Sequence, residues 1–452
     1  MTEGRPIRLI LGIALPLMVG NIFQQLYTVV DASVVGKGIG MSALAALGAS
    51  DWFNWLFLSA VQGFAQGFTI PMAQAFGADD YDDLRKSVGN AIFLSVITAA
   101  VITVLALVLI RPVLQLLETP VEIRPMSTAY LTVLFAGLPV VMAYNLLAGI
   151  LRALGDGRSP LYAMLVAALV NIALDVLFVI GFGWGVESAA AATVIAQFCS
   201  CLFCLWRLRG VEILRLKRED LRIDAVRCRR LMALGLPVSL QNAIIAVGGM
   251  IVQRVVNPLG VTFIAGYTAT NKLYGVLEVA AISYGYAMST YAGQNLGAGK
   301  IQRIRKGVHA GAITGVITAL IIAAMMFLFG RNIVGLFVDH AEANVEEVIR
   351  IACQYLWLMS AFLPVLYILH AYRSTLQGMG NTVMPMISGL AEFVMRTGAA
   401  ILLPSLIGYW GVFYAEVLAW AGADVILLVS YWHIFRQISR RYGGGRDLPD
   451  PA

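Results

Sequence analysis

Long apolar segments separated by short polar loops recur along the whole chain. Each segment has about 20 residues, the length of helix that crosses the hydrocarbon core of a bilayer. The pattern predicts an all-α polytopic membrane protein with twelve transmembrane helices. The expected spans begin near Arg8, Asp51, Asn90, Ser127, Pro160, Glu187, Leu231, Thr262, Gly311, Ile351, Met384 and Gly411.

The second half of the chain repeats the first at a shift of about 220 residues. Residues 73–78 align with 293–298, and residues 137–139 align with 362–364. Each half holds six expected spans, so the two copies have the same topology. This predicts two parallel-repeat six-helix bundles, an arrangement typical of secondary transporters that bind substrate between the halves.

The most charged stretch of the chain, from Arg207 to Arg230, lies between the two halves. Its simplest interpretation is a solvated linker. The expected organisation is an N-terminal six-helix lobe with the ion site (1–207), a cytoplasmic basic linker (208–230), a C-terminal six-helix lobe (231–436) and a cytoplasmic tail (437–452).

Composition supports a membrane location, because the chain is 59% hydrophobic and only 13% charged. Soluble domains contain about 25% charged residues. Lys and Arg gather in loops on one side, which predicts an inner or plasma membrane protein with both termini in the cytoplasm. The net charge of +6 is better explained by anionic lipid headgroups than by nucleic acid. We expect a monomer whose partners are the bilayer and a small-molecule substrate.

Two acidic residues, Asp31 and Asp175, lie far from any expected helix end. A carboxylate at the centre of a lipid-facing helix costs about 2.5 to 3.5 kcal/mol, so such residues usually face a polar cavity. Gln24 and Tyr27 share a helix face with Asp31, and Asn171 shares one with Asp175. These residues are expected at one depth, in the outer half of the membrane.

Thr193 on the sixth span completes this cluster. Two carboxylates in a low-dielectric cavity repel one another, so one of them can retain a proton. The amide and hydroxyl oxygens could instead coordinate sodium, and a purely structural hydrogen-bond network is the third interpretation. The cluster suits ion exchange rather than bond breaking. It predicts no catalytic residue, no bound metal and no cofactor apart from the coupling ion, H⁺ or Na⁺.

Aromatic residues suggest a candidate substrate path. Tyr284, Met288 and Tyr291 lie on the eighth span, and Tyr27 lies on the first. Stacking and cation–π contacts could bind flat or cationic compounds there, although ordinary packing explains the same pattern.

Glu392 and Arg396 are four residues apart on the eleventh span. Residues at this spacing are neighbours on a helix surface, so the two side chains are expected to neutralise one another in a structural ion pair.

Four stretches of the chain carry a family resemblance: residues 16–36, 43–48, 171–175 and 185–197. They resemble multidrug and toxic compound extrusion (MATE) transporters, and the likeness extends over nearly the whole chain. The resemblance implies a twelve-helix, two-lobed antiporter that expels organic cations and related drugs in exchange for protons or sodium. It implies Pro16 as a bending point, although membrane helices also tolerate proline without such a role. It implies an N-terminal ion site made of Asp31, Gln24, Asn171, Asp175 and Thr193.

The C-terminal lobe departs from the family pattern. The sodium-coupled branch has one acidic residue on the seventh helix and one on the tenth. On the seventh helix this chain has the polar residues Gln241, Asn242 and Gln253 instead. On the tenth it has His370, Tyr372 and Arg373. We therefore expect the coupling ion, a proton rather than sodium, in the N-terminal lobe.

Two other functions remain open. A lipid-linked sugar or polysaccharide flippase of the same superfamily would differ in substrate class. A membrane-embedded transferase would need metal-binding acids, for which Asp79, Asp80, Asp82 and Asp83 are the candidates. A solvated charge cluster at a helix start explains those four residues more simply.

Overall fold

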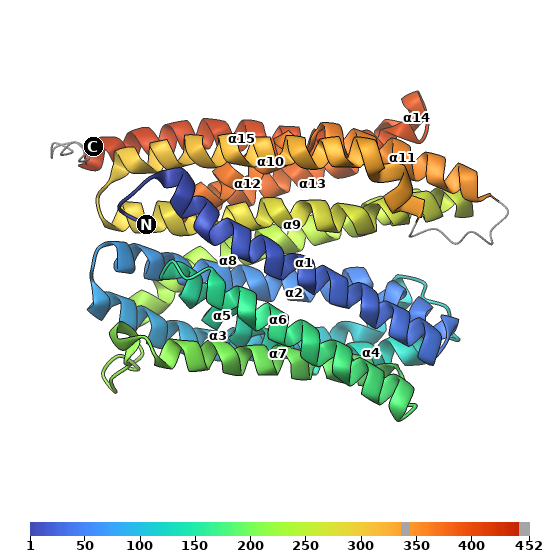
Figure 1. Ribbon diagram of the computed structural model, residues 1–452, viewed down its shortest axis with the longest axis horizontal. Coiled ribbons are helices and arrows are strands. Elements are labelled where there is room, and N and C mark those ends of the chain that lie inside the picture. The colour runs from blue at the N-terminus through green and yellow to red at the C-terminus, as the bar shows by residue number, and fades with distance from the viewer. Residues whose placement is uncertain (336–343, 443–452) are drawn as a thin grey trace. The chain divides into compact units, whose positions relative to one another are not determined.

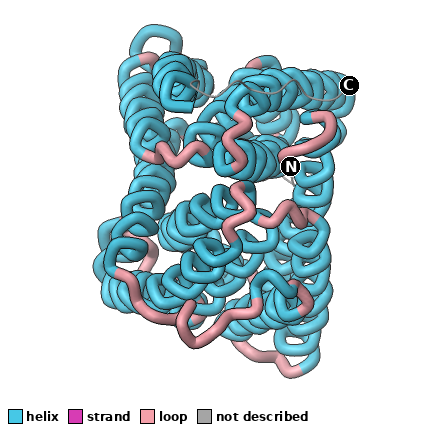
Figure 2. The backbone as a smooth tube through the Cα atoms, turned by 90° about the vertical axis from the view of Figure 1, so that its left-hand side faces the viewer, coloured by secondary structure: helices cyan, strands magenta, loops and turns pink. Residues whose placement is uncertain are grey.

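The computed structural model describes residues 1–335 and 344–442, and this part of the chain is helical without strands (Figures 1 and 2). The first half contains α1 (Pro6–Gly38), α2 (Met41–Gly77), α3 (Tyr81–Leu116), α4 (Arg124–Ala136), α5 (Leu138–Ala153), α6 (Arg158–Asp175), η1 (Val176–Gly181) and α7 (Val186–Arg209). The second half contains η2 (Glu212–Leu214), α8 (Ala225–Val256), η3 (Asn257–Leu259), α9 (Val261–Gly297), α10 (Ile301–Gly335), α11 (Val345–Ala361), α12 (Leu363–Gly378), α13 (Val383–Leu402), α14 (Pro404–Ile407) and α15 (Trp410–Tyr442).

These helices match the twelve expected spans. Within the described residues, eight helices are long and apolar enough to cross a membrane, and two bent helix pairs satisfy the same test when each is taken as one span. Helices α2 and α9, each 37 residues long and equivalent in the two halves, are the remaining two of the twelve spans. Several helices begin earlier than predicted, most clearly α2, α3 and α10. Polar first turns precede the apolar runs of α3 and α10, whereas α2 has a largely apolar extra segment before Asp51.

The bent pairs occupy equivalent places in the two halves. The axis turns by 44° between α4 and α5, and by 49° between α11 and α12. Pro139 and Pro364 lie in the first turns of α5 and α12. Proline has no N–H and its ring clashes with the preceding turn, so a new helix starts there instead of continuing the old one.

Contacts divide the chain into two compact units. The N-terminal unit is Leu15–Ala246, and the C-terminal unit joins Met1–Ala14 to Val247–Ala452. Both repeat one packing pattern: α2 packs on α3 and α5 as α9 packs on α10 and α12, and α6 pairs with α7 as α13 pairs with α15. This recurrence agrees with the internal duplication. The expected lobe boundaries stay a prediction, and residues 443–452 of the expected tail lie outside the described residues.

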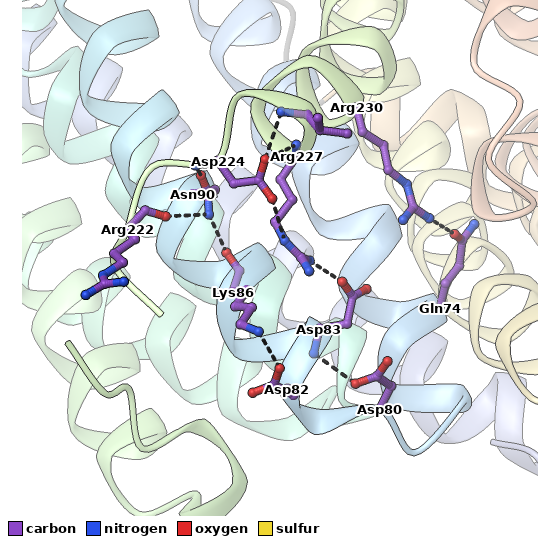
Figure 3. Close-up of polar contacts among 11 residues, drawn as sticks. Gln74, Asp80, Asp82, Asp83, Lys86, Asn90, Arg222, Asp224, Arg227 and Arg230 are labelled. Carbon is purple, nitrogen blue, oxygen red and sulfur yellow. Dashed lines mark hydrogen bonds and ion pairs between the residues drawn. The ribbon is translucent and has the colours of Figure 1, made fainter. Parts of the chain in front are cut away.

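Residues 210–224, which we call the connection, join α7 to α8 and dock on the start of α3 (Figure 3). Asn90 donates from Nδ2 to the Arg222 carbonyl at 3.3 Å, and its Oδ1 accepts from the Asp224 N–H at 2.8 Å. Arg227, in the first turn of α8, forms an ion pair with Asp83. The connection is therefore held against the N-terminal unit, and most of its residues are exposed.

Candidate functional site

Polar side chains from three helices of the N-terminal unit come together at the candidate site. They are Gln24, Tyr27 and Asp31 on α1, Asn171 and Asp175 on α6, and Thr193 and Gln197 on α7. Helices α6 and α7 pack along one another, and Asn171 donates from Nδ2 to Oγ1 of Thr193 at 3.3 Å. The Tyr27 side chain interacts with both glutamine side chains. The structure thus brings together the residues that the sequence singled out.

Asp31 and Asp175 form the centre of this cluster. Their side chains come from different helices, are 7% and 0% exposed, and are close enough to interact electrostatically. An ionised carboxylate is only an acceptor, so a hydrogen bond between two carboxyl groups requires a proton on one of them. Two ionised carboxylates in a buried site repel one another, and a proton or a cation between them would remove that repulsion.

Hydrogen-bond acceptors exceed donors around the pair. Among the described residues, no donor reaches Asp31 Oδ1, either carboxylate oxygen of Asp175, Asn171 Oδ1 or Gln197 Oε1, although all are buried. Buried polar atoms without partners are rare and costly. Oxygen atoms gathered in this way suit a proton or a hard cation such as sodium.

Two features of the site were missed by sequence reasoning. Tyr130 of α4 is buried close enough to Asp31 and Asp175 to interact with them electrostatically. Directly after Asp175 the helix widens into the π-helical turn η1. Such turns are frequent at functional sites, but no residue in Val176–Gly181 marks one in the sequence.

Pro16 lies inside α1, which continues through it as one helix. A proline within a helix removes one backbone hydrogen bond, here the bond to the carbonyl of Gly12. The division between the two contact units also falls here, between Ala14 and Leu15. The hinge role of Pro16 stays a prediction.

The C-terminal unit contains a separate buried ion network. Arg396 donates to Glu392 at 2.8 Å, which confirms their predicted pairing, and also to Glu416 of α15 at 2.8 Å. Arg373 of α12 donates to the other oxygen of Glu392 at 2.7 Å. Asp424 of α15 is also buried, and its Oδ1 has no hydrogen-bond partner among the described residues. Two arginines and two glutamates thus neutralise one another across three helices.

The sequence model of the MatE family matches this chain twice, at residues 16–177 and 237–402. The chain belongs to the MatE family. Its relatives include the probable multidrug resistance protein YpnP of Bacillus subtilis, which is 26% identical over 417 residues and 91% of each chain. The probable multidrug resistance protein YoeA of the same organism is 27% identical over 335 residues and 72% of each chain. The two matches also confirm the duplication.

The fold also matches solved structures of MATE-type transporters. One is a MOP superfamily transporter from Pyrococcus furiosus, for which reverse polarity of the binding pocket suggests a different function. Its TM-score is 0.89 at 22% identity, and 97% of each chain is covered. The MatE chain is therefore a multi-pass membrane transporter of the multidrug efflux family and not an enzyme.

In the MatE chain the four aspartates before and within the first turn of α3 have structural partners. Asp80 accepts a hydrogen bond from the Asp83 N–H at 2.9 Å and so caps α3. Asp82 pairs with Lys86 at 2.5 Å, and Asp79 accepts from the Tyr81 hydroxyl at 3.2 Å. Within the described residues, no group of three or more His, Cys, Asp or Glu side chains could hold a metal ion.

Tyr27 of the candidate substrate path lies in the N-terminal cluster described above, and the other members, Tyr284, Met288 and Tyr291, are packed in the C-terminal unit. The Tyr291 hydroxyl donates to the Arg303 carbonyl at 3.0 Å, and Tyr284 shares a hydrogen bond with Thr318 at 3.0 Å. Met288 is fully buried beside α10. These contacts match the packing interpretation, and a role in substrate binding stays a prediction.

Proposed function

We propose that this MatE protein is a secondary active antiporter that exports small cationic or amphipathic organic compounds in exchange for protons. The proposal places it in the cell membrane, as a monomer with cytoplasmic termini, and needs no cofactor besides the coupling ion. The observation that carries it is the Asp31–Asp175 pair, a buried pair of carboxyl groups that receives no basic partner among the described residues. Relatives named as probable multidrug resistance proteins support drug-like substrates.

Coupling follows from the charge on this pair. With one proton the two carboxyl groups share a hydrogen bond and carry one negative charge, and a second proton cancels that charge. The neutral pair no longer repels its neighbours, so the polar face of α1 can repack around Pro16 and favour the other access state. Proton entry from outside would in this way drive substrate release.

Sodium is the second candidate ion, because oxygens of Asn171 and Gln197 also lack donors beside the pair. A sodium ion could take ligands from these amides and from Asp31 and Asp175. Both candidates use the same residues, so one experiment can separate them.

The test is dye efflux from proteoliposomes under imposed gradients. A pH gradient without a sodium gradient should drive efflux, and a sodium gradient at equal pH should not. Efflux driven by sodium alone and abolished by Asp31→Asn would assign sodium to the same site. Absence of efflux under both gradients, with transport of a lipid-linked sugar in the same vesicles, would favour the flippase alternative.

A further inference from the structure

The connection lies at a defined depth relative to the membrane. Residues 91–110 of α3 form an uncharged apolar run, and about 20 helical residues cover the bilayer core. Gly89 and Asn90 directly precede this run. Asn90 holds the Arg222 carbonyl and the Asp224 N–H, as described above. If the apolar run of α3 fills the bilayer core, residues 220–224 lie at the boundary between hydrocarbon and headgroups.

Close backbone packing makes this placement rigid. A Cβ atom on Gly89 would collide with the carbonyl oxygen of Asp220, so only glycine allows the chain to approach α3 this closely. The Asp220 carboxylate is buried, accepts the Lys217 N–H at 2.7 Å and faces Arg85 Nε at 3.6 Å. The backbone faces the protein, which leaves neighbouring side chains directed outward.

The outward side chains at this level are apolar. Leu221, Ile223 and Val226 are 53%, 61% and 78% exposed. In contrast, Ile213 and Leu214 of the same connection pack against the hydrophobic core of the N-terminal unit. A rigid segment that holds aliphatic side chains away from the protein, at the depth where hydrocarbon begins, suits insertion into the interface.

Basic side chains surround these three residues. Arg218, Arg222 and Arg229 are exposed, and within the part of the chain that the structure describes none of them forms an ion pair. The neighbouring acids Asp220 and Asp224 are engaged, the first with Arg85 and the second with Arg227 at 3.2 Å. The exposed Glu219 offsets only one of the three arginine charges. The free charge of the segment is therefore positive, which complements phosphate groups of anionic lipids.

We propose that the connection and the start of α8 form an interfacial anchor, in which Leu221, Ile223 and Val226 insert into the bilayer surface while Arg218, Arg222 and Arg229 bind anionic phospholipid headgroups. The anchor would set the height of α3, and with it the N-terminal unit, in the membrane. This proposal concerns only the lipid partner and does not depend on which ion or substrate is transported.

The first test measures depth. Ile223→Cys, in the full chain with its five native cysteines replaced, carries a nitroxide label in nanodiscs that contain phosphatidylglycerol. The label should be reached by oxygen and shielded from a water-soluble nickel complex. Arg215→Cys, on the same connection with a 78% exposed side chain, is the water-facing control. Val226→Cys repeats the measurement if the label at 223 disturbs folding.

The second test measures lipid selectivity by native mass spectrometry. Arg218→Gln with Arg222→Gln should weaken retention of phosphatidylglycerol about thirtyfold, from about 1 kcal/mol for each arginine near an anionic surface. Arg215→Gln with Lys217→Gln removes the same charge from the same connection and should have a clearly smaller effect. The proposal is overturned if the label at 223 is as water-accessible as that at 215, or if both double variants lose lipid equally.

Discussion

Asn171 donates a hydrogen bond to Thr193 across 3.3 Å, which joins α6 to α7 one turn before Asp175. Because the amide nitrogen is used in this bond, the Asn171 Oδ1 atom is left as an acceptor, and no donor reaches it among the described residues. The contact therefore adds one oxygen to the cluster around the two carboxyl groups.

Thr193→Val should weaken both the fold and the coupling. The substitution preserves shape but leaves the Asn171 amide without its acceptor, which costs about 1 to 3 kcal/mol for a buried donor. We expect a lower midpoint of thermal unfolding and slower gradient-driven efflux. Thr193→Ser keeps the oxygen and should restore both, whereas an efflux rate unchanged by Thr193→Val would remove this contact from the mechanism.

Asp31→Asn and Asp175→Asn should each abolish coupled transport without preventing folding. An amide can still donate to the remaining carboxylate, so the contact between α1 and α6 survives while proton exchange is lost. Proteoliposome efflux should fall to background, with unfolding temperatures close to that of the unsubstituted protein. Glu187→Gln, an exposed change in the first turn of α7, is the control and should retain efflux. Full activity of both aspartate variants would reduce the pair to a structural network.

Glu392→Gln should be among the most destabilising single changes in the C-terminal unit. It removes the carboxylate that Arg373 and Arg396 share, and breaking a buried ion pair costs about 3 to 5 kcal/mol. Glu416→Gln should cost less, because Arg396 then keeps Glu392. Thermal unfolding of the purified variants compares the two, and equal losses would contradict the network described above.

Two glycines of α10 should respond differently to alanine. A Cβ on Gly307 would collide with the ring of Tyr291, which is fixed by its bond to the Arg303 carbonyl. At Gly311 the collision is with the Met288 side chain, which can adopt other rotamers. Gly307→Ala should therefore cost about 1 to 3 kcal/mol and Gly311→Ala less, as measured by unfolding midpoints. The reverse order would show that Tyr291 yields more easily than Met288.

The proposed orientation has a direct test. With native cysteines replaced, Arg215→Cys should resist an impermeant maleimide in intact cells and react once the cells are permeabilised. Labelling in intact cells would place the connection outside and reverse the proposed topology.

Some of this architecture follows from the sequence because it depends on pattern alone. Apolar length predicts the spans, and the aligned prolines Pro139 and Pro364 reveal the repeat. The spacing of Asn171 and Asp175 puts both on one face of α6. The spacing of Glu392 and Arg396 predicts their ion pair in the same way. Such contacts lie within one helix, where geometry is fixed by the helical period.

Contacts between helices could not be derived in this way. Arg373 joins the network of Glu392 because α12 and α13 meet at one height, which depends on the bend before α12. Tyr130 reaches the acid pair for a similar reason, through the placement of α4. The π-helical turn after Asp175 carries no sequence signature, since the same residues would fit an ordinary helix.

The paired short helices also constrain how the chain enters a membrane during synthesis. Helices α4 and α5 have 13 and 16 residues, and α11 and α12 have 17 and 16, so each is shorter than the roughly 20 residues that span a bilayer. We therefore expect each pair to enter the membrane as one segment, with the bend forming between its two parts.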